Sequence, residues 1–297
     1  MASTQDLKRR VRSISNTRKL TKAMELVASA RLRRAALRIE AMRPYAERMQ
    51  ELMAGTAKAA GASRQPLLER RDNVRALGIV VVAGDRGLAG AFNAQVLRRS
   101  LALMREAQAE GREVKFFTVG KKAQSTIRFR GLPLAEAWTG FSDKPDYSAA
   151  QAIAHRIADA YIGEEVDRVV LVYNEYVSAL VQRVSVTDLL PIPLDALGEG
   201  EETVPEVDAH PPDFFFEPEP RNILERLLPV YVETQLYRAL LESAASFFGA
   251  QMTAMRNASK AAGELIDTLT LAMNRARQAE ITQEILEVVA GADALTQ

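Results

Sequence analysis

Two long helical stretches, one at each end of the chain, constrain the fold more than any other feature of the sequence. The first runs from about residue 5 to 58 and the second from about residue 221 to 291. Because an α-helix rises 1.5 Å per residue, they would be roughly 80 and roughly 100 Å long, several times the width of a small domain. Helices of this length do not fit around an ordinary globular core, so we expect them to pack on each other as an antiparallel coiled coil.

Apolar residues in both stretches recur at spacings of three and four, the pattern of one buried helical stripe. In the first stretch the predicted stripe is Leu7, Val11, Ile14, Leu20, Met24, Val27, Leu32, Ala35, Ile39, Met42, Ala46, Met49 and Met53. In the second it is Leu227, Tyr231, Thr234, Arg238, Leu241, Ala245, Phe248, Met252, Met255, Ser259, Ala262, Ile266, Leu269, Met273 and Ala276. Pro44 predicts a kink, Pro229 predicts a separate short helix before the second stretch, and Gly291 predicts a C-terminal cap.

The middle of the chain has a different pattern. The apolar run Ala76–Ala83 is typical of a buried parallel strand. After it, predicted strands (113–120, 134–138, 168–176) alternate with predicted helices (91–111, 121–129, 147–161), and 180–187 predicts an edge strand in a hairpin with 168–176. This alternation favours a small Rossmann-like α/β layer. We therefore expect an α/β protein in four parts: an N-terminal coiled-coil helix (1–60), a globular α/β domain (75–190), a Pro-rich acidic linker (191–220) and a C-terminal coiled-coil helix (221–297).

Composition excludes several classes of protein. The formal net charge of +1 argues against a general polyanion binder, and the absence of cysteine excludes disulfides and thiolate metal sites. His155 and His210 lack metal-ligand spacing, so we expect no metal site. No apolar run reaches the ~20 residues of a membrane span, and the polar N-terminus carries no secretory signal. The sequence predicts a soluble intracellular protein.

One loop has the glycine content of a phosphate-binding turn. Gly84, Gly87 and Gly90 lie between the first predicted strand and the following helix. Their spacing is G-x-x-G-x-x-G, not the G-x-G-x-x-G of dinucleotide-binding folds, and no Gly-Lys-Ser/Thr follows. We interpret these glycines as a structural turn. No Ser/His/Asp, Cys/His or carboxylate arrangement indicates catalysis, so we expect no catalytic residues and no cofactor.

The first forty residues are strongly basic. Eleven Lys and Arg side chains stand there against Asp6, Glu25 and Glu40. Nucleic acid could bind such a helix, but it lacks the interleaved aromatic residues that stack on bases. The pattern favours an acidic protein partner or a solvated face, and no nucleic acid.

Three segments resemble the gamma subunit of F-type ATP synthases. They are Leu7–Ala28, Asp85–Asn93 and Gly263–Ile285, and they occur in the family's order along the chain. The resemblance implies a non-catalytic central-stalk rotor that couples rotation of the membrane c-ring to ATP synthesis or hydrolysis on β. It also implies as partners three α and three β subunits, the epsilon subunit and the c-ring, without direct nucleotide binding. The implied location is peripheral, on the cytoplasmic face of a bacterial cell membrane.

The resemblance also implies the residues that couple rotor to stator. Met24 matches a methionine at which the family's coupling is sensitive, and the basic cluster that includes Lys19 and Lys22 would face acidic loops on β. In the C-terminal helix the matching polar contacts to β are Arg277, Gln278, Thr282 and Glu284.

The chain departs from the family pattern in a few places. Gln251 stands where Arg is usual, Phe247-Phe248 replaces smaller or polar residues, and Ala89 occupies a position that is often Cys. The insert with a regulatory cysteine pair is missing, so we expect no thiol control. Two other interpretations of the sequence remain open. The chain could be a nucleotide-binding α/β protein with a coiled-coil arm, or a basic coiled-coil adaptor that binds nucleic acid.

Overall fold

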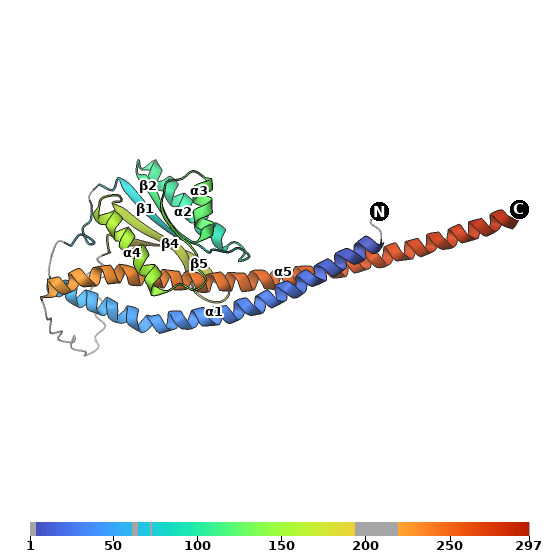
Figure 1. Ribbon diagram of the computed structural model, residues 1–297, viewed down its shortest axis with the longest axis horizontal. Coiled ribbons are helices and arrows are strands. Elements are labelled where there is room, and N and C mark those ends of the chain that lie inside the picture. Colours follow the sequence, from blue (N-terminus) through green and yellow to red (C-terminus); the bar gives the residue numbers. More distant parts are fainter. Residues whose placement is uncertain (1–3, 61–64, 72, 194–218, 297) are drawn as a thin grey trace, which may run out of the picture. The chain divides into compact units, whose positions relative to one another are not determined.

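The computed structural model describes residues 4–60, 65–71, 73–193 and 219–296 (Figure 1). The chain divides into two compact units: the coil unit, Met1–Ser29 with Gln251–Gln297, and the α/β unit, Ala30–Ala250. The end helices α1 (Thr4–Ala60) and α5 (Pro220–Thr296) each contribute to both units. Most of the predicted linker, residues 194–218, lies outside the described residues, and the four-part division stays a prediction.

The α/β unit is built on a five-stranded sheet with the order β3-β2-β1-β4-β5. Its strands are β1 (Ala76–Val82), β2 (Glu113–Val119), β3 (Leu134–Trp138), β4 (Arg168–Tyr176) and β5 (Gln182–Leu190). The first four strands pair in parallel, and β5 pairs antiparallel with β4 at the edge. The predicted hairpin and the predicted α/β fold are therefore confirmed.

Side chains that alternate along each strand enter two separate cores, as the period of two requires. Ile79 and Val81 of β1 belong to the core beneath α2 (Phe92–Ala109) and α3 (Lys121–Phe129). Val80 and Val82 belong to the core on the other face, beneath α4 (Tyr147–Ile162). Both faces are covered, which explains why β1 reads as a continuous apolar run rather than an alternating one.

The core under α4 also contains the end helices. Met49 and Met53 of α1 cluster there with Leu224, Leu228 and Val232 of α5. The expectation that two such long helices pack only on each other is therefore wrong for residues 30–60 and 220–250. A sheet face that α4 alone cannot cover is buried by these two helix segments, which gain apolar burial that a two-helix coil does not offer.

In the coil unit, α1 and α5 pair along one seam. The part of the predicted α5 stripe that lies in this unit is confirmed, because every member from Met252 to Ala276 is buried or half-buried, whereas Arg238, earlier in the predicted stripe, is exposed. The α1 stripe was wrong at Leu20 and Val27, which are 61% and 52% exposed. Thr21, Glu25 and Ala28 are buried instead. The error is one of phase, since choosing the apolar neighbour one position away turns the stripe by about 100° around the helix.

The end helices are longer and less interrupted than the sequence predicts. Pro44 lies inside α1 and Pro229 inside α5, so the described residues 220–228 belong to α5 and form no separate short helix. The buried neighbours Leu228 and Tyr231 anchor α5 on the core, and this packing outweighs the one backbone hydrogen bond that a proline removes. The predicted cap at Gly291 is also wrong, because α5 continues to Thr296.

Among the helices that the structure describes, none offers a stretch apolar enough to cross a bilayer.

Candidate functional site

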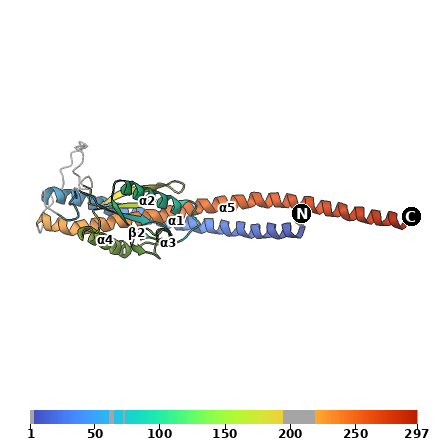
Figure 2. The same ribbon diagram turned by 90° about the horizontal axis from the view of Figure 1, so that it is seen from above.

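Beyond Glu280, α5 pairs with no other helix of the part of the chain that the structure describes. Thr4, at the start of α1, donates its hydroxyl to Glu280 Oε2 at 2.6 Å, which marks where the pairing of the two helices ends. In both ribbon views α5 continues beyond the N-terminus of α1 (Figures 1 and 2). All residues from 277 to 290 are exposed, and after Glu280 the helix presents its whole circumference.

The four predicted contact residues of α5 lie at the start of that segment. Arg277, Gln278, Thr282 and Glu284 occupy about two helical turns, and all are exposed. The Thr282 hydroxyl donates to the Gln278 carbonyl at 2.9 Å, within the same helix. Arg277, Gln278 and Glu284 make no side-chain hydrogen bond or ion pair with any other residue in the described part of the chain. They are available to a partner.

The predicted contact residues of α1 lie elsewhere on the coil unit. Lys19 is exposed, Met24 is half-buried at the seam, and Lys22 has a 59% exposed side chain. Glu25 pairs with Arg256, so Met24 lies level with that part of α5, about twenty residues before Arg277. The predicted site residues therefore form two groups, separated by roughly 30 Å along the coil.

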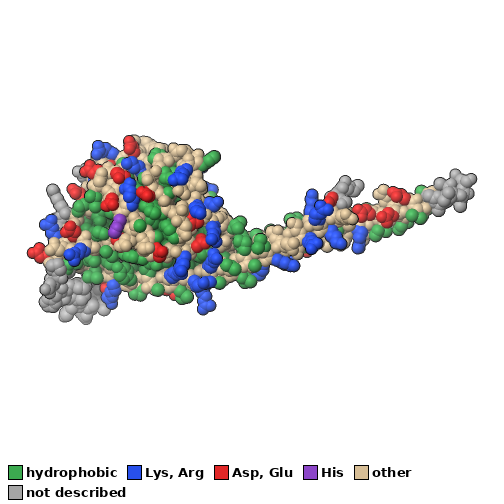
Figure 3. All heavy atoms as spheres, viewed as in Figure 1, with side chains coloured by type: hydrophobic (Ala, Val, Ile, Leu, Met, Phe, Trp, Pro, Cys, Tyr) green, Lys and Arg blue, Asp and Glu red, His purple; other side chains and the backbone are tan. Residues whose placement is uncertain are grey.

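The surface between and around these groups is basic and apolar. Figure 3 shows Lys and Arg side chains gathered along the N-terminal part of α1. Apolar side chains lie exposed on the same unit: Leu20, Leu26, Val27, Leu265 and Leu271 at 47–62%, and Ile281, Ile285, Leu286, Val288 and Val289 at 47–72%. Many exposed apolar side chains beside charged ones on one unit favour a surface that binds protein.

Sequence reasoning missed the most buried charge of the coil unit. Glu25 is 6% exposed, and its carboxylate accepts from Lys22 Nζ and Arg256 Nε, each at 3.0 Å. The hydrogen bond from Lys22, followed by that from Arg256, lowers the pKa of Glu25 below its ordinary 4.5 although burial opposes this. Keeping the stripe in phase from Leu7 by heptads, through Ile14 and Thr21 to Ala28, would have placed Glu25 on the seam.

The glycine loop after β1 is held by side chains of its own unit. The Gly84 amide donates to Asn93 Oδ1 and the Asp85 amide to Ser142 Oγ, both at 2.8 Å. Gly84 leaves room for the Phe247 ring, whose atoms lie 3.1 and 3.2 Å from where a Cβ would stand. Gly90 has a φ of 57°, in the left-handed region that favours glycine, whereas a Cβ on Gly87 would meet only Lys122.

Asp85 links this loop to the next helix. Its carboxylate accepts from the backbone amides of Lys121 and Gly140 at 3.0 Å and of Ser142 at 3.2 Å, and from the Ser142 hydroxyl at 2.9 Å. Burial raises the pKa of Asp85, but these hydrogen bonds outweigh it and hold the pKa below the ordinary 3.8. A fixed carboxylate thus occupies the start of α3, at the carboxyl ends of the parallel strands where such folds bind phosphates.

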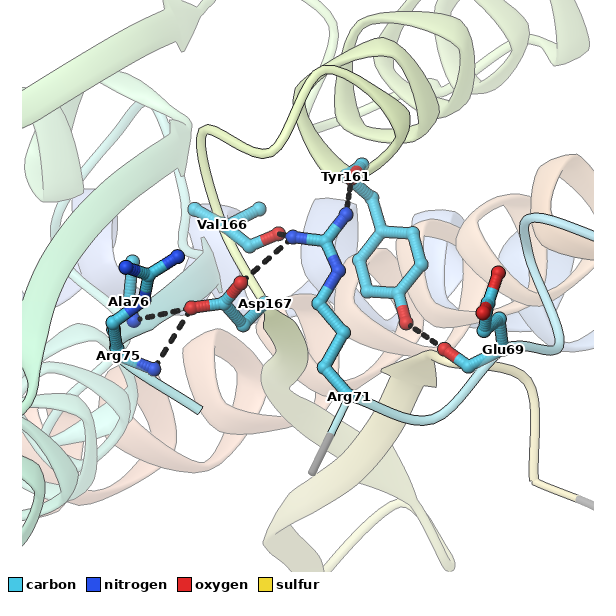
Figure 4. Close-up of polar contacts among 7 residues, drawn as sticks. All are labelled: Glu69, Arg71, Arg75, Ala76, Tyr161, Val166 and Asp167. Atoms are coloured by element: carbon cyan, nitrogen blue, oxygen red, sulfur yellow. Dashed lines mark hydrogen bonds and ion pairs between the residues drawn. The ribbon is translucent and has the colours of Figure 1, made fainter. Parts of the chain in front are cut away.

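At the amino ends of the strands a second buried carboxylate has a structural role. Asp167 accepts from Arg71 at 2.7 Å and from the amides of Arg75 and Ala76 at 2.8 Å (Figure 4). Arg71 also donates to the Tyr161 and Val166 carbonyls. Although burial raises the pKa of Asp167, the Arg71 hydrogen bond and the two amides lower it below 3.8. The cluster ties the chain before β1 to the start of β4.

His155, one of the two histidines of the chain, lies beside a carboxylate of α5. His155 Nε2 lies 2.9 Å from Glu233 Oε1, and Glu233 also accepts from the Tyr147 hydroxyl at 2.7 Å. His210 lies outside the described residues. Within them, no group of three or more His, Cys, Asp or Glu side chains could hold a metal ion.

Sequence comparison places the whole chain in one family. The sequence model of the ATP synthase family, ATP-synt, matches residues 3–295. The chain is 46% identical over 295 residues to the ATP synthase gamma chain of Rubrobacter xylanophilus, covering 99% of each. It is 41% identical to the gamma chain of Moorella thermoacetica, covering 99% of this chain and 100% of that one.

Solved structures agree with this placement. The chain is similar to a protein chain in the structure of the central stalk and c-ring of the Tetrahymena thermophila mitochondrial ATP synthase. The TM-score is 0.59 and the sequence identity 26%, over 81% of this chain and 99% of that chain. It shares its fold with a chain of the Euglena gracilis enzyme, with a TM-score of 0.70 and 18% identity, over 98% and 94% of the two chains. From the first turn of α1 to the last turns of α5, this chain belongs to the ATP synthase gamma-chain family.

Proposed function

We propose that this chain is the central-stalk rotor of an F-type ATP synthase and couples ion-driven rotation of a membrane c-ring to ATP synthesis or hydrolysis on β subunits. It has no catalytic role of its own. Its partners are three α and three β subunits, an epsilon subunit and the c-ring, and it is held peripherally at the cytoplasmic face of a bacterial membrane. The observation that carries the proposal is the exposed end of α5 in a chain with gamma-chain likeness over its whole length.

The physical logic of coupling follows from asymmetry. A shaft of two unequal helices inside a ring of near-threefold symmetry touches each β subunit differently. Each contact biases the equilibrium of that β subunit between conformations of different nucleotide affinity. Arg277, Gln278, Thr282 and Glu284 would make these contacts at one level, and Lys19, Lys22 and Met24 at another. The exposed apolar side chains near the end of α5 make no directional bonds, which suits a part that turns.

The nucleotide-binding alternative loses support from the loop geometry. Two amides that a phosphate would need, those of Gly84 and Asp85, donate to Asn93 and Ser142. The carboxylate of Asp85 would also repel an anion at the start of α3.

Co-expression with the α and β subunits of the same source tests the proposal. We expect a purified complex that hydrolyses ATP and contains one copy of this chain for every three α–β pairs, measured by quantitative mass determination. Active α–β assemblies that leave this chain free would overturn the proposal. Titration of the isolated chain with ATP then separates the alternative, because a rotor has no saturable nucleotide site of its own.

A further inference from the structure

The seam of the coil unit contains a carboxylate where a coiled coil ordinarily has an apolar side chain. Glu25 is 6% exposed and lies between Thr21 and Ala28, which are also buried. Burying an ionised carboxylate is unfavourable unless it is paired and hydrogen-bonded. Stability alone therefore does not explain a glutamate at position 25, since an apolar side chain there would stabilise the coil at least as well.

Both oxygens of the carboxylate are engaged, and they reach both helices. Oε2 accepts from Lys22 Nζ on the preceding turn of α1, and Oε1 accepts from Arg256 Nε on α5. The Arg256 contact joins the two helices at one level. It exists only when residue 25 faces residue 256.

The apolar part of the seam does not define that level. On α5 the seam follows two heptad series of similar small or aliphatic residues: Met252, Ser259, Ile266 and Met273, and Met255, Ala262, Leu269 and Ala276. A shift of α1 by one heptad, about 10 Å, would again set apolar residues against apolar residues. Repetitive seams of this kind permit several registers unless a polar residue distinguishes them.

A second contact supports the same register. The Arg18 guanidinium carbon lies 3.6 Å from where a Cβ would stand on Gly263, so Arg18 packs beside this position of α5. Shifted by one heptad in one direction, Glu25 would face Gly263 and lose its cross-helix cation. Shifted in the other direction, Arg18 would face Arg256, cation against cation. Both shifted registers are therefore penalised by charge.

We propose that Glu25 is a positioning residue that sets the axial register of α1 against α5 through its ion pairs with Lys22 and Arg256. Its importance for coupling rests on the proposed rotor function, because a register shift would change the roughly 30 Å offset between the Met24 group and the Arg277 group. The register itself is a property of this chain alone and can be measured without partners.

The test uses distances between spin labels, and the absence of native cysteines makes specific labelling possible. Cysteines replace Ala23 and Ala272, which are exposed and about fourteen residues apart along the coil. This axial offset of roughly 20 Å makes the label distance sensitive to sliding. The distance between the two spin labels is measured by pulsed electron paramagnetic resonance, on the full-length chain alone and on the chain assembled with α and β subunits.

We expect a single narrow distance for the labelled parent chain and a second population, displaced on the order of 10 Å, for Glu25→Leu. Thermal stability of Glu25→Leu should equal or exceed that of the parent, since an apolar side chain replaces a buried charge. The triple charge reversal Lys22→Glu, Glu25→Arg and Arg256→Glu should restore the single distance.

The control is Glu264→Gln, which removes an exposed ion pair with Lys260 on the same unit and should leave the distance unchanged. If Glu25→Leu does not fold, Glu25→Gln applies the same test with the shape retained. A single unshifted distance in the Glu25 variants, with reduced thermal stability, would overturn the proposal and leave Glu25 an ordinary stabilising residue. If the labelled parent chain gives the expected distance on its own but does not assemble with α and β subunits, the result would instead count against the rotor function.

Discussion

The carboxylate of Asp85 accepts the backbone amide of Lys121 at 3.0 Å, so the loop after β1 is tied to the first residue of α3 by a charge-assisted hydrogen bond. The same carboxylate holds Gly140 and Ser142 in the loop after β3. One side chain thus joins the segments that follow three adjacent strands. Hydrogen bonds within the chain therefore occupy the donors at this edge of the sheet.

Asp85→Ala should lower the free energy of unfolding by about 2–3 kcal/mol, because several donors lose a charged acceptor. Urea unfolding of the full-length chain measures the loss. The matched control is Asp188→Asn, which removes the exposed ion pair with Arg168 and should cost less than about 1 kcal/mol. Equal effects of the two substitutions would contradict the role assigned to Asp85.

Asp167→Asn should destabilise the chain by roughly 3 kcal/mol, since it leaves the Arg71 guanidinium without its buried partner. The effect has a defined pH dependence. The folded pKa of Asp167 is lowered, so its contribution is present above the ordinary value of 3.8 and is lost as pH falls through the folded pKa. Unfolding measured above and below that value should show a shallower acid slope for Asp167→Asn than for the parent. Identical slopes would mean that Asp167 is not the titrating group.

Gly120→Ala should be far more damaging than Gly131→Ala. Both glycines have positive φ, +95° and +64°, and both substitutions carry that backbone strain. A Cβ on Gly120 would also stand 2.1 Å from the Ala83 carbonyl oxygen, whereas nothing lies within 4 Å of one on Gly131. We expect a loss of about 1 kcal/mol for Gly131→Ala and at least about 3 kcal/mol for Gly120→Ala. Thermal unfolding of the two variants in parallel isolates the steric part.

Arg277→Ala combined with Gln278→Ala should leave assembly intact and lower ATP-driven proton pumping in membrane vesicles. Both side chains are exposed where the pairing of α5 with α1 ends, and neither bonds to α1 in the described residues, so the change should remove contacts to a partner without disturbing the coil. Arg275→Ala, also exposed and two positions before Arg277, serves as the matched surface control. Unchanged pumping in the double variant would remove these two residues from the coupling contacts.

The existence of the elements could be predicted from the sequence. The predicted strands at 113–120, 134–138 and 168–176 and the predicted helix at 121–129 agree with the structure within a residue or two, because their apolar patterns are local and strong. The two groups of contact residues that the resemblance implies stay a prediction, and the structure shows only that all of them except the half-buried Met24 are exposed. The predicted α1 stripe is wrong at Leu20 and Val27. The buried face of α1 is set by its contact with α5, and the local pattern of apolar residues in α1 carries no information on that contact.

Local pattern therefore determined which segments are helix and strand, since backbone periodicity follows from the residues themselves. Only the tertiary structure decided what those segments bury. It set Glu25 opposite Arg256, Asp85 at the start of α3, and Met53 in one core with Leu224. Each of these pairs joins residues distant in the chain, and a buried charge or a shared core is stable only when both members meet in the folded protein.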